Sequence, residues 1–259
     1  MPKFNASSDL LQYRRLFGLI GYPLSHSFSK KYFTQKFEEE GITDSIYELF
    51  PLETIQDFPE LIQTFPNFRG LNVTIPYKEQ VIPFLDELDA GAAAIGAVNT
   101  ILVENGKLTG YNTDAFGFES SLKQFLKDHK SPPENALILG TGGAAKAVMF
   151  VLDQLGISWK TVSRDSQKGD LTYEKLKDIS LDPYLLIINT SPVGMAPAIE
   201  NYPDIPYHCL GNRHLLYDLV YNPLETTFLQ KGKQQGAATM NGLAMLNGQA
   251  KRAWSIWNQ

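Results

Sequence analysis

Cysteine is nearly absent from this sequence, since Cys209 is the single thiol among 259 residues. One cysteine cannot close an internal disulfide or supply a cysteine-rich metal site, so disulfide-stapled secreted proteins and zinc-ribbon folds are excluded. Hydrophobic residues make up 43% of the chain, enough to bury a core without such cross-links. We therefore expect a fold held together by apolar packing, in a reducing compartment, with no bound metal.

Long apolar runs and clusters of basic residues are also lacking. A run of about 18 apolar residues occurs nowhere, and the opening stretch MPKFNASSDLLQYRRLFGLIGYP has no apolar block behind a basic head. These absences predict a cytoplasmic protein without a membrane anchor. The net charge is −5 and the Lys and Arg residues are scattered, which argues against nucleic acid and anionic membranes as partners. The expected ligand is a small molecule, and both a monomer and a homodimer stay open.

What the sequence does contain is a regular alternation of apolar strand-like runs and helical patterns. This alternation is typical of an α/β architecture, and the length favours two domains over one. In the first half, Asn105-Gly106 between two such runs predicts a β-hairpin. The other elements expected there are strands at 15–21, 45–50, 70–75 and 97–103, and helices at 29–40, 54–64 and 78–88.

The second half reads as a series of βα units, which predicts a parallel sheet with its ligand beyond the carboxyl ends of the strands. The expected elements are strands at 136–140, 159–164, 184–190 and 215–221, and helices at about 115–128, 144–155 and 173–178. The last 19 residues predict an amphipathic helix with one apolar stripe, formed by Leu243, Leu246, Ala250, Trp254 and Trp257.

The stretch LILGTGGAAKAV carries the strongest chemical signal. Gly140, Gly142 and Ala145 fit the pattern G-x-G-x-x-A directly after an apolar strand and at the start of a helix. In that context the first glycine permits the tight turn, and the second lets the backbone approach a pyrophosphate at the helix amino terminus. The pattern predicts a dinucleotide-binding turn.

The choice of dinucleotide depends on the end of the next strand, TVSRDSQK. Ser163 stands where an acidic residue usually meets a free ribose 2′-hydroxyl, and Arg164 with Lys168 nearby can meet a 2′-phosphate. These residues favour NADP over NAD. Asp165 acts against that preference, because its carboxylate beside Arg164 can repel the phosphate or bond the ribose. The use of NAD therefore stays open.

Small polar residues gather where the first strands end. Ser27 and Ser29 precede a predicted helix, and two hydroxyls there suit the oxygens of a substrate carboxylate. In GLNVTIPYKE, Asn72 and Thr74 face the same side of a predicted strand, and Lys78 begins the next predicted helix, where a neutral amine is favoured for proton transfer. Asn99 and Asp114 add an amide and a carboxylate, which completes a set suited to a hydroxylated carboxylic acid.

Eight strings in this order resemble the shikimate dehydrogenase family, over about residues 20–255: GYPLSHSFS, NVTIPYKE, GAVNTI, GYNTDAFG, LGTGGAAKAV, INTSPVGM, YDLVYNP and NGLAMLNGQA. The resemblance implies reversible NADP-dependent reduction of 3-dehydroshikimate to shikimate, a step toward chorismate and the aromatic amino acids. It also implies a substrate-binding domain of residues 1–114 and 240–259, with a doubly wound Rossmann-type NADP domain of residues 115–239 between them. The carboxyl-terminal helix would then return to the first domain.

The resemblance also implies residue roles. Lys78 and Asp114 would form the catalytic pair. Ser27 and Ser29 would hold the substrate carboxylate, and the ring hydroxyls would meet Asn72, Thr74, Asn99, Asp114 and Gln249. Tyr221 would lie near the substrate, and Gly242 near the nicotinamide. The cofactor would contact Gly140, Thr141, Gly142, Gly143, Ala144, Ser163, Arg164, Lys168, Thr190 and Gly242.

Two departures from the family pattern leave alternatives open. Lys30 stands where the family usually has proline, which adds a cation near the expected carboxylate pocket. Ser163-Arg164-Asp165 replaces the usual Asn-Arg-Thr or Asn-Arg-Ser, which leaves relaxed use of NAD open. The second reading is therefore an enzyme that also uses NAD or acts on quinate, whose extra C1 hydroxyl would meet the groups around Ser27 and Lys30. A third reading, a non-catalytic nucleotide-sensing module, predicts a degraded catalytic pair, whereas Lys78 and Asp114 are both present.

Overall fold

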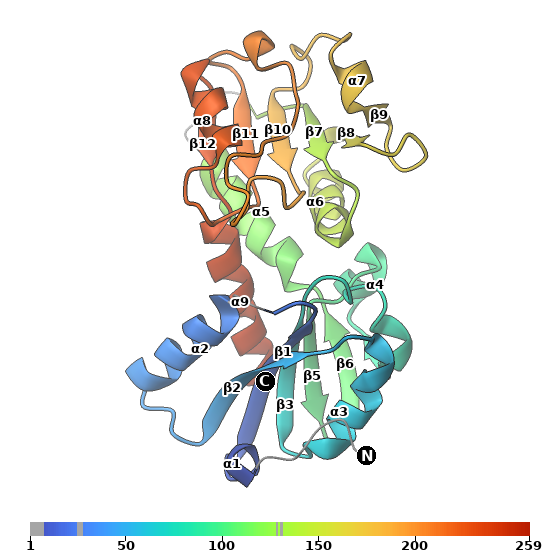
Figure 1. The fold of residues 1–259 in the computed structure, drawn as a ribbon, viewed down its shortest axis with the longest axis vertical. Helices are drawn as coiled ribbons and strands as arrows, with labels where there is room; N and C mark the ends of the chain where they lie inside the picture. The colour runs from blue at the N-terminus through green and yellow to red at the C-terminus, as the bar shows by residue number, and fades with distance from the viewer. Residues whose placement is uncertain (1–7, 25–27, 128, 130–131) are drawn as a thin grey trace. The chain divides into compact units, whose positions relative to one another are not determined.

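Two compact units make up the structure, a computed structural model that describes residues 8–24, 28–127, 129 and 132–259. The first unit comprises the described residues up to Thr113 together with Ala250–Gln259, and the second comprises the described residues of Asp114–Gln249. Each unit contains one six-stranded sheet with helices packed against it (Figure 1). This confirms the predicted α/β fold class. Among the described residues, no helix is both long enough and apolar enough to cross a membrane.

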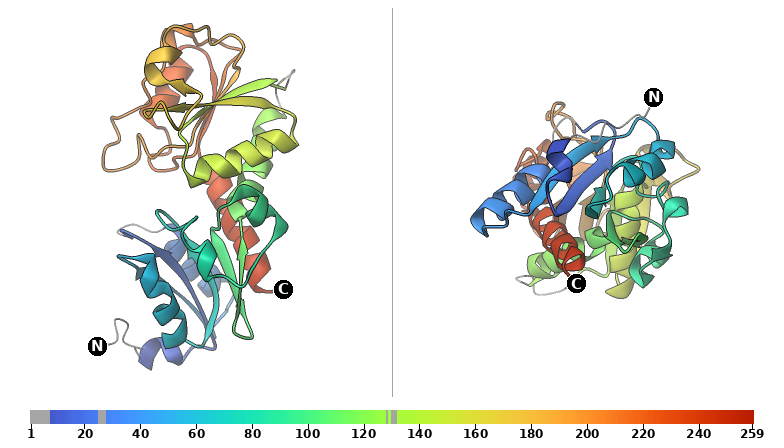
Figure 2. Two further views of the ribbon diagram at one scale, coloured as in Figure 1. Left: turned by 90° about the vertical axis from the view of Figure 1, so that its right-hand side faces the viewer. Right: turned by 90° about the horizontal axis from the view of Figure 1, so that it is seen from below.

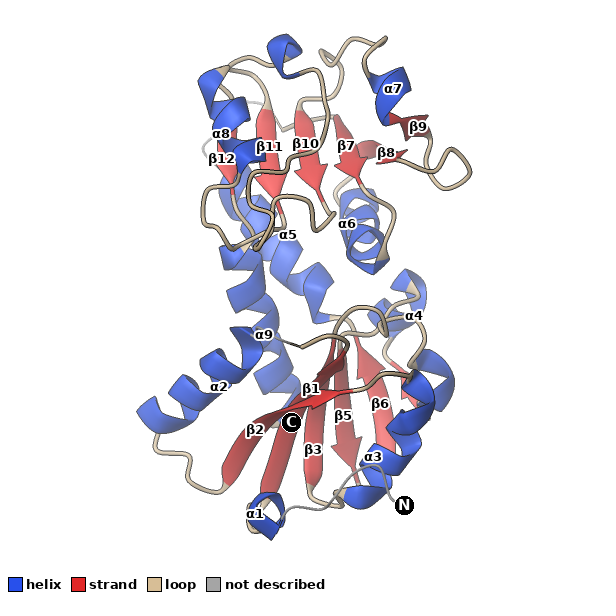
Figure 3. Cartoon of the chain, viewed as in Figure 1, coloured by secondary structure: helices blue, strands red, loops and turns tan. Residues whose placement is uncertain are grey.

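The sheet of the first unit is mixed. Its order is β2-β1-β3-β5-β6-β4, with β1 parallel to both of its neighbours and β5 antiparallel to β3 and β6 (Figure 3). Asn105 and Gly106 both have positive φ, of 51° and 79°, which confirms the predicted hairpin between β5 and β6. The strands are β1 Arg15–Gly21, β2 Ser45–Pro51, β3 Phe68–Val73, β4 Glu87–Leu88, β5 Thr100–Glu104 and β6 Lys107–Tyr111.

Strand β1 is buried on both faces, which explains its continuous apolar sequence. Leu16 and Ile20 belong to one core cluster, while Phe17 and Leu19 belong to another on the opposite side of the strand. The helices that cover the sheet are α1 Ser8–Leu11, α2 Phe28–Glu39, α3 Phe58–Thr64 and α4 Ala90–Ile95, with 3₁₀ turns η1 Ile55–Asp57 and η2 Ile82–Phe84.

The helix predicted over 78–88 is wrong. The structure has only the turn η2 and the short strand β4 in this segment. Pro83 explains the difference, because it has no N–H for the helical bond to residue 79, and the neighbouring amides bond three residues back instead, as Phe84 does to the Val81 carbonyl at 3.0 Å. The expected strand over 70–75 also stops at Val73.

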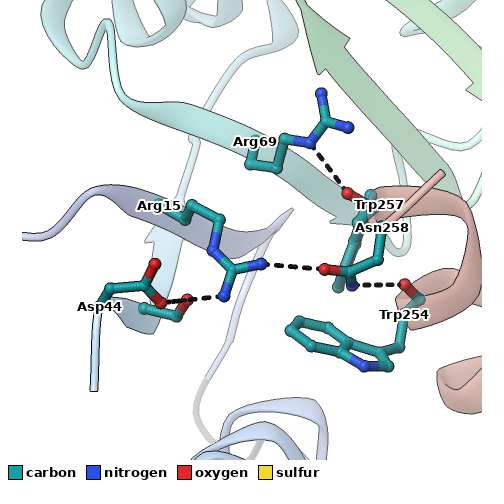
Figure 4. Close-up of polar contacts among 7 residues, drawn as sticks. Arg15, Asp44, Arg69, Trp254, Trp257 and Asn258 are labelled. Carbon is teal, nitrogen blue, oxygen red and sulfur yellow. Dashed lines mark hydrogen bonds and ion pairs between the residues drawn. The ribbon is translucent and has the colours of Figure 1, made fainter. Parts of the chain in front are cut away.

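The carboxyl-terminal end of helix α9 (Leu243–Trp257) is fixed to the first unit by polar contacts (Figure 4). The Arg69 side chain donates to the Trp257 carbonyl at 2.9 Å, and the Trp257 indole N–H donates to the Ile101 carbonyl at 3.0 Å. Arg15 donates to Asp44 and to Asn258, both at 2.9 Å. The last residues therefore complete the core of the first unit, as the predicted return of this helix requires.

Gly70 makes room for the Trp257 ring, and we expect Gly70→Ala to destabilise the first unit. A Cβ at this position would lie 2.1 Å from the indole Nε1 and 2.3 Å from Cδ1, and the ring is fully buried. Overpacking of this kind costs about 1–3 kcal/mol, so the urea midpoint should fall. Gly211→Ala is the control, because its Cβ would meet open space. Equal midpoints for the two variants would contradict this packing argument.

The sheet of the second unit is parallel throughout, in the order β12-β11-β10-β7-β8-β9. Chain order runs outward from β7 in both directions, so the topological switch point lies between β7 and β10. This arrangement confirms the predicted doubly wound, Rossmann-type unit. The strands are β7 Asn135–Leu139, β8 Ser158–Ser163, β9 Leu171–Thr172, β10 Leu186–Asn189, β11 Leu215–Asp218 and β12 Ala238–Met240.

Helices α5 (Thr113–Leu126) and α9 approach each other closely in the second unit, because a glycine of α5 faces α9. A Cβ on Gly117 of α5 would lie 2.4 Å from the Met245 carbonyl of α9, so the two helices lie side by side (Figure 2). Ala250 and Trp257 of the predicted apolar stripe are buried, whereas Leu243, Leu246 and Trp254 are half-buried. The remaining elements are α6 Gly143–Gln154, α7 Tyr173–Leu176, α8 Thr227–Gln234 and the 3₁₀ turn η3 Tyr207–Cys209.

Candidate active site

The glycine turn lies at the switch point of the second sheet. Gly140 follows β7 with φ of 124°, a backbone angle that side chains rarely adopt. Its missing Cβ would lie 2.7 Å from the Thr190 hydroxyl oxygen, and that hydroxyl donates to the Leu139 carbonyl at 3.0 Å. The turn after β7 and the residue after β10 are therefore in contact, as a nucleotide crevice at this point requires.

The amino terminus of α6 is open to a ligand. Gly142 is its cap residue and offers no side chain to cap the first turn, and a Cβ on Gly142 would have no neighbour within 4 Å. Gly143 and Ala144 begin the helix, one residue earlier than predicted. Unpaired N–H groups at a helix amino terminus favour a phosphate, so this part of the unit fits a pyrophosphate.

A polar hollow of about 440 Å³ adjoins this turn. Thr141 from the turn lines it together with residues at and beyond the end of β8: Ser163, Arg164, Asp165 and Lys168. The structure thus brings together four of the residues that the sequence assigned to the dinucleotide: Thr141, Ser163, Arg164 and Lys168. Two cations and one carboxylate in one hollow suit an anionic group such as a phosphate.

The carboxylate of Asp165 is engaged within its own loop. Its Oδ1 accepts from the Gln167 amide at 3.0 Å, and its Oδ2 lies 3.6 Å from the Lys168 ammonium. The Ser163 hydroxyl oxygen accepts from the Asp165 amide at 3.1 Å. These bonds give Asp165 a role in shaping the loop, which weakens the reading of it as a ribose ligand.

A buried carboxylate, which the sequence analysis missed, holds the loops after β10 and β11. Asp218 has no exposed surface; its Oδ1 accepts from the Asn189 side chain at 2.9 Å and the Val220 amide at 3.0 Å. Its Oδ2 accepts from the Thr226 hydroxyl at 2.6 Å. Thr190 and Tyr221 lie next in the chain to members of this network, so Asp218 fixes the backbone that carries both.

We expect Asp218 to make the stability of the protein depend on pH. Burial raises the pKa of this carboxyl from 3.8 to about 6, against the opposing hydrogen bonds from Thr226, Val220 and Asn189. The folded state therefore binds the proton more tightly than the unfolded state. Stability falls as pH rises from about 3.8 to about 6, by roughly 3 kcal/mol in all, and is constant above that range.

Asp218→Asn isolates this effect, because the amide cannot ionise. The free energy of unfolding of the variant relative to wild type should rise by roughly 2 kcal/mol between about pH 4 and about pH 8, measured by urea unfolding, since the unfolded carboxyl is already partly ionised at pH 4. Asp44→Asn is the control of opposite sign, since hydrogen bonds from Arg15 and Ser45 lower the pKa of that carboxyl. A pH-independent difference for Asp218→Asn would refute the assignment.

In the first unit, the two predicted amides lie in one buried hydrogen-bond network. Asn72 donates to the Thr100 hydroxyl at 3.1 Å and to the Asn99 carbonyl at 3.3 Å. The Asn99 side chain accepts from the Thr113 amide at 2.7 Å and donates to the Thr113 hydroxyl at 3.0 Å. Asn72 and Asn99 are thereby held rigidly, and Thr113 is tied to them. Asp114, 5% exposed, is the residue that follows Thr113 in the chain.

Lys78 lies at the end of the first sheet that carries this network, although not at the start of a helix. Its carbonyl accepts from the Val98 amide at 2.7 Å, directly before Asn99, and its side chain is half-buried. Thr74 is joined to β1 through its amide, which donates to the Ile20 carbonyl at 2.9 Å. Because no helix begins at Lys78, no helix dipole acts on its side chain to favour a neutral amine.

Tyr47 of β2 joins this network and was missed in the sequence. Its hydroxyl, on a side chain only 1% exposed, donates to Asn72 Oδ1 at 2.8 Å and also hydrogen-bonds to Ser29. Ser29 belongs to α2, and Ser27 lies outside the described residues. Lys30 binds both carboxylate oxygens of Glu48, at 2.7 and 2.8 Å, so the cation that departs from the family pattern has an internal counter-ion.

The remaining candidates belong to the second unit. Tyr221 is half-buried, and burial raises the pKa of its phenol. Gly242 donates to the Val220 carbonyl at 3.1 Å, and a Cβ there would lie 2.0 Å from the Leu219 carbonyl oxygen, so only glycine fits. Gln249 is half-buried in α9, and its backbone amide nitrogen would lie 3.0 Å from a Cβ on Gly117 of α5.

Comparisons with known proteins agree over nearly the whole chain. Residues 19–101 match the family described as the shikimate dehydrogenase substrate binding domain. The chain is 44% identical over 266 residues to the shikimate dehydrogenase (NADP(+)) of Halothermothrix orenii, which covers 93% of this chain and 89% of that relative. Two of the 98 solved chains that match are informative because of the ligands they contain.

The first is the shikimate 5-dehydrogenase of Thermus thermophilus in complex with NADP(H) and shikimate. It is 32% identical with a TM-score of 0.79, over 93% of this chain and 92% of the other. The second is the quinate dehydrogenase of Corynebacterium glutamicum in complex with NAD. It is 25% identical with a TM-score of 0.83, over 93% of each chain.

These likenesses confirm three predictions made from the sequence: the family resemblance, the class of NADP-dependent oxidoreductase, and the fold with its two α/β parts. The curated relative is far above 30% identity and is covered over most of its length. The chain therefore belongs to the shikimate dehydrogenase (NADP+) family.

Proposed function

We propose that this protein catalyses the reversible NADP-dependent reduction of 3-dehydroshikimate to shikimate, in the cytoplasm. The observation that carries the proposal is the rigid polar network at one end of the first sheet, where Asn72 and Asn99 are fixed beside the Lys78 backbone. The full-length similarity to shikimate dehydrogenases supports the choice of substrate. The first unit would bind the substrate and the second unit the cofactor.

Substrate binding would use the two ends of this network. Ser27 and Ser29 would hold the carboxylate, and Asn72, Thr74 and Asn99 would meet the ring hydroxyls. Because Asn72 Nδ2 is used by Thr100 and by the Asn99 carbonyl, the group it can offer a ligand is its Oδ1, which also accepts from Tyr47. A substrate hydroxyl would then donate to Asn72. Tyr221 and Gln249 are proposed as further substrate contacts.

Lys78 is the proposed proton donor, with Asp114 as its partner. NADPH, when bound, supplies the hydride that reduces the C3 carbonyl carbon. The Lys78 ammonium would donate a proton to the oxygen on that carbon, and the Asp114 carboxylate would orient the ammonium. Thr113 supports this pairing, because its bonds to Asn99 fix the backbone on which Asp114 follows.

NADP would bind at the switch point of the second sheet. The open amino terminus of α6, with Gly140, Thr141, Gly142, Gly143 and Ala144, fits the pyrophosphate, and Thr190 lies against the turn. Arg164 and Lys168 would meet the 2′-phosphate in the hollow that Ser163 also lines. Gly242 is proposed to lie near the nicotinamide.

The alternative is a quinate and shikimate dehydrogenase with relaxed use of NAD. It has less support, because identity to the quinate enzyme is 25% against 44% to the shikimate enzyme. Quinate adds a hydroxyl at C1 beside the carboxylate, where Lys30 follows Ser29 in α2 and pairs with Glu48 of β2. A non-catalytic nucleotide sensor is the remaining reading, and the presence of Lys78 and Asp114 argues against it.

The test compares kcat/KM for shikimate and quinate oxidation, each with NADP and with NAD. The proposal expects shikimate with NADP to have the largest value of the four. A value for quinate equal to or above that for shikimate would overturn the proposed substrate. Binding of NADP without turnover of either acid would revive the nucleotide sensor. Sedimentation of the same sample would distinguish a monomer from a homodimer.

A further inference from the structure

The loop between β8 and β9 is closed by three reciprocal hydrogen bonds between Thr161 and Asp170. Asp170 Oδ2 accepts from the Thr161 amide at 2.8 Å and from the Thr161 hydroxyl at 2.7 Å. The Asp170 amide in turn donates to the Thr161 hydroxyl oxygen at 3.1 Å. We call these three bonds the Thr161–Asp170 clasp. The bonds from Thr161 hold the pKa of the Asp170 carboxyl below its ordinary value, as expected for a carboxylate that they stabilise.

The clasp adjoins the residues that line the hollow. Thr161 is buried in β8, two residues before Ser163. Gly169 precedes Asp170 and closes against Ser163, since a Cβ on Gly169 would lie 2.7 Å from the Ser163 Cβ. Both ends of the segment 164–168 are therefore fixed to β8, which leaves that short loop few conformations.

Inside the loop, a second set of bonds orders the turn that carries the two cations. The Asp165 carboxylate accepts from the Gln167 amide, and the Asp165 carbonyl accepts from the Lys168 amide at 3.1 Å. Lys168 is further drawn toward Asp165 by charge. Arg164 and Lys168 thus flank a turn whose ends the clasp holds, and both line the same hollow.

We propose that Thr161 is a positioning residue for the cofactor, which through the clasp holds Arg164 and Lys168 in place for the 2′-phosphate. This inference rests on the proposed NADP site, and it assigns part of the selectivity for NADP to a buried residue that does not line the hollow. A flexible loop would have to be ordered when the phosphate binds, at a cost in affinity that falls on the 2′-phosphate alone.

The test is Thr161→Val, which keeps the shape and β-branching of the side chain and changes no charge. Replacing Asp170 would instead remove a negative charge near the phosphate, so the loss of the clasp could not be separated from the change in electrostatic repulsion. Binding of 2′,5′-ADP and of 5′-AMP is measured by calorimetry, because the two ligands differ by the 2′-phosphate and require no turnover. We expect the Kd of 2′,5′-ADP to rise about 10-fold and that of 5′-AMP to change less than about 2-fold.

Two further variants show whether the hydroxyl is the cause. Thr161→Ser keeps the hydroxyl and should restore most of the affinity for 2′,5′-ADP. Thr172→Val removes a hydroxyl from β9 that caps α7 at the Lys175 amide, outside the loop, and should leave the ratio of the two affinities unchanged. Amide hydrogen exchange over 164–169 should be faster in Thr161→Val than in wild type.

Equal weakening of both ligands in Thr161→Val would overturn the proposal, because it would indicate general damage to the unit. An unchanged Kd for 2′,5′-ADP would also overturn it. Equal affinity of the wild-type protein for 2′,5′-ADP and 5′-AMP would be a separate result, because it would refute the proposed 2′-phosphate site itself.

Discussion

Replacement of Lys78 by alanine should lower kcat for shikimate oxidation by at least about 100-fold, with a smaller change in KM. A positioned general acid or base contributes typically about 10²–10⁴-fold to the rate, and this chain offers Lys78 for that role, with its carbonyl bonded to the amide of Val98, the residue before Asn99. Steady-state kinetics with saturating NADP measures the effect. Lys78→Met is the companion variant, since it keeps most of the length of the side chain and removes only the amine.

Lys107→Ala is the matched control for Lys78. Lys107 is in the same unit, at the hairpin end of β6, where it pairs with Glu87 at the surface. Its removal should leave both kcat and KM near wild type. A Lys78→Ala enzyme with near wild-type kcat would show that the proton comes from another group, while the fold and the cofactor site would stand.

Replacement of Arg164 by alanine should raise KM for NADP by about 10- to 100-fold and leave KM for NAD nearly unchanged. A charge-assisted hydrogen bond contributes about 1.5–3 kcal/mol, and only NADP carries the 2′-phosphate that Arg164 would meet. Initial rates with the two cofactors at saturating shikimate provide the comparison. Selectivity for NADP should therefore fall by the same factor.

Two variants sharpen this test. Asp165→Asn should keep the preference for NADP, because in the structure that side chain bonds the Gln167 amide rather than standing free for a ribose. Arg213→Ala removes an exposed arginine of the same unit that pairs with Asp182 at 3.1 Å, and should change neither KM. Equal losses with NADP and NAD in Arg164→Ala would contradict contact with the 2′-phosphate.

The nucleotide-binding part of the fold was predictable because its signals are local. Strand β7 reads as an unbroken apolar run since it is buried on both faces, and Gly140 adopts a backbone angle that favours glycine. The hairpin at Asn105 and Gly106 followed from turn chemistry for the same reason. Each of these features depends on residues adjacent in the chain.

Elements governed by distant packing were missed. Helix α8 contains Gly232, which lowers helix propensity, yet a Cβ there would lie 2.2 Å from Leu216 of β11, so the glycine lets the helix pack on the sheet. Helix α4 is short and was also missed, although Asp89 caps it by accepting from the Ala92 amide and Gly96 ends it with φ of 68°. In α8 the contact with β11 outweighs the low helix propensity of glycine. The signals that bound α4 are local, and the sequence prediction overlooked them because the helix is short.

The polar partners of the candidate site could not be predicted from spacing. Tyr47 and Asn72 are 25 positions apart, and Asn189 and Asp218 are 29 positions apart. The sequence could only suggest side chains for contact with a ligand, because their types fit the ligand. It gave no sign of the residues that hold those side chains, because strand order alone brings them together.

The most direct test of the account follows oxidation of the reduced cofactor by its absorbance when 3-dehydroshikimate is added to the purified protein. We expect rapid oxidation of NADPH that requires the substrate, with kcat/KM for NADPH at least about 10-fold above that for NADH. Oxidation that favoured NADH, or binding of NADPH with no oxidation on adding 3-dehydroshikimate, would contradict it.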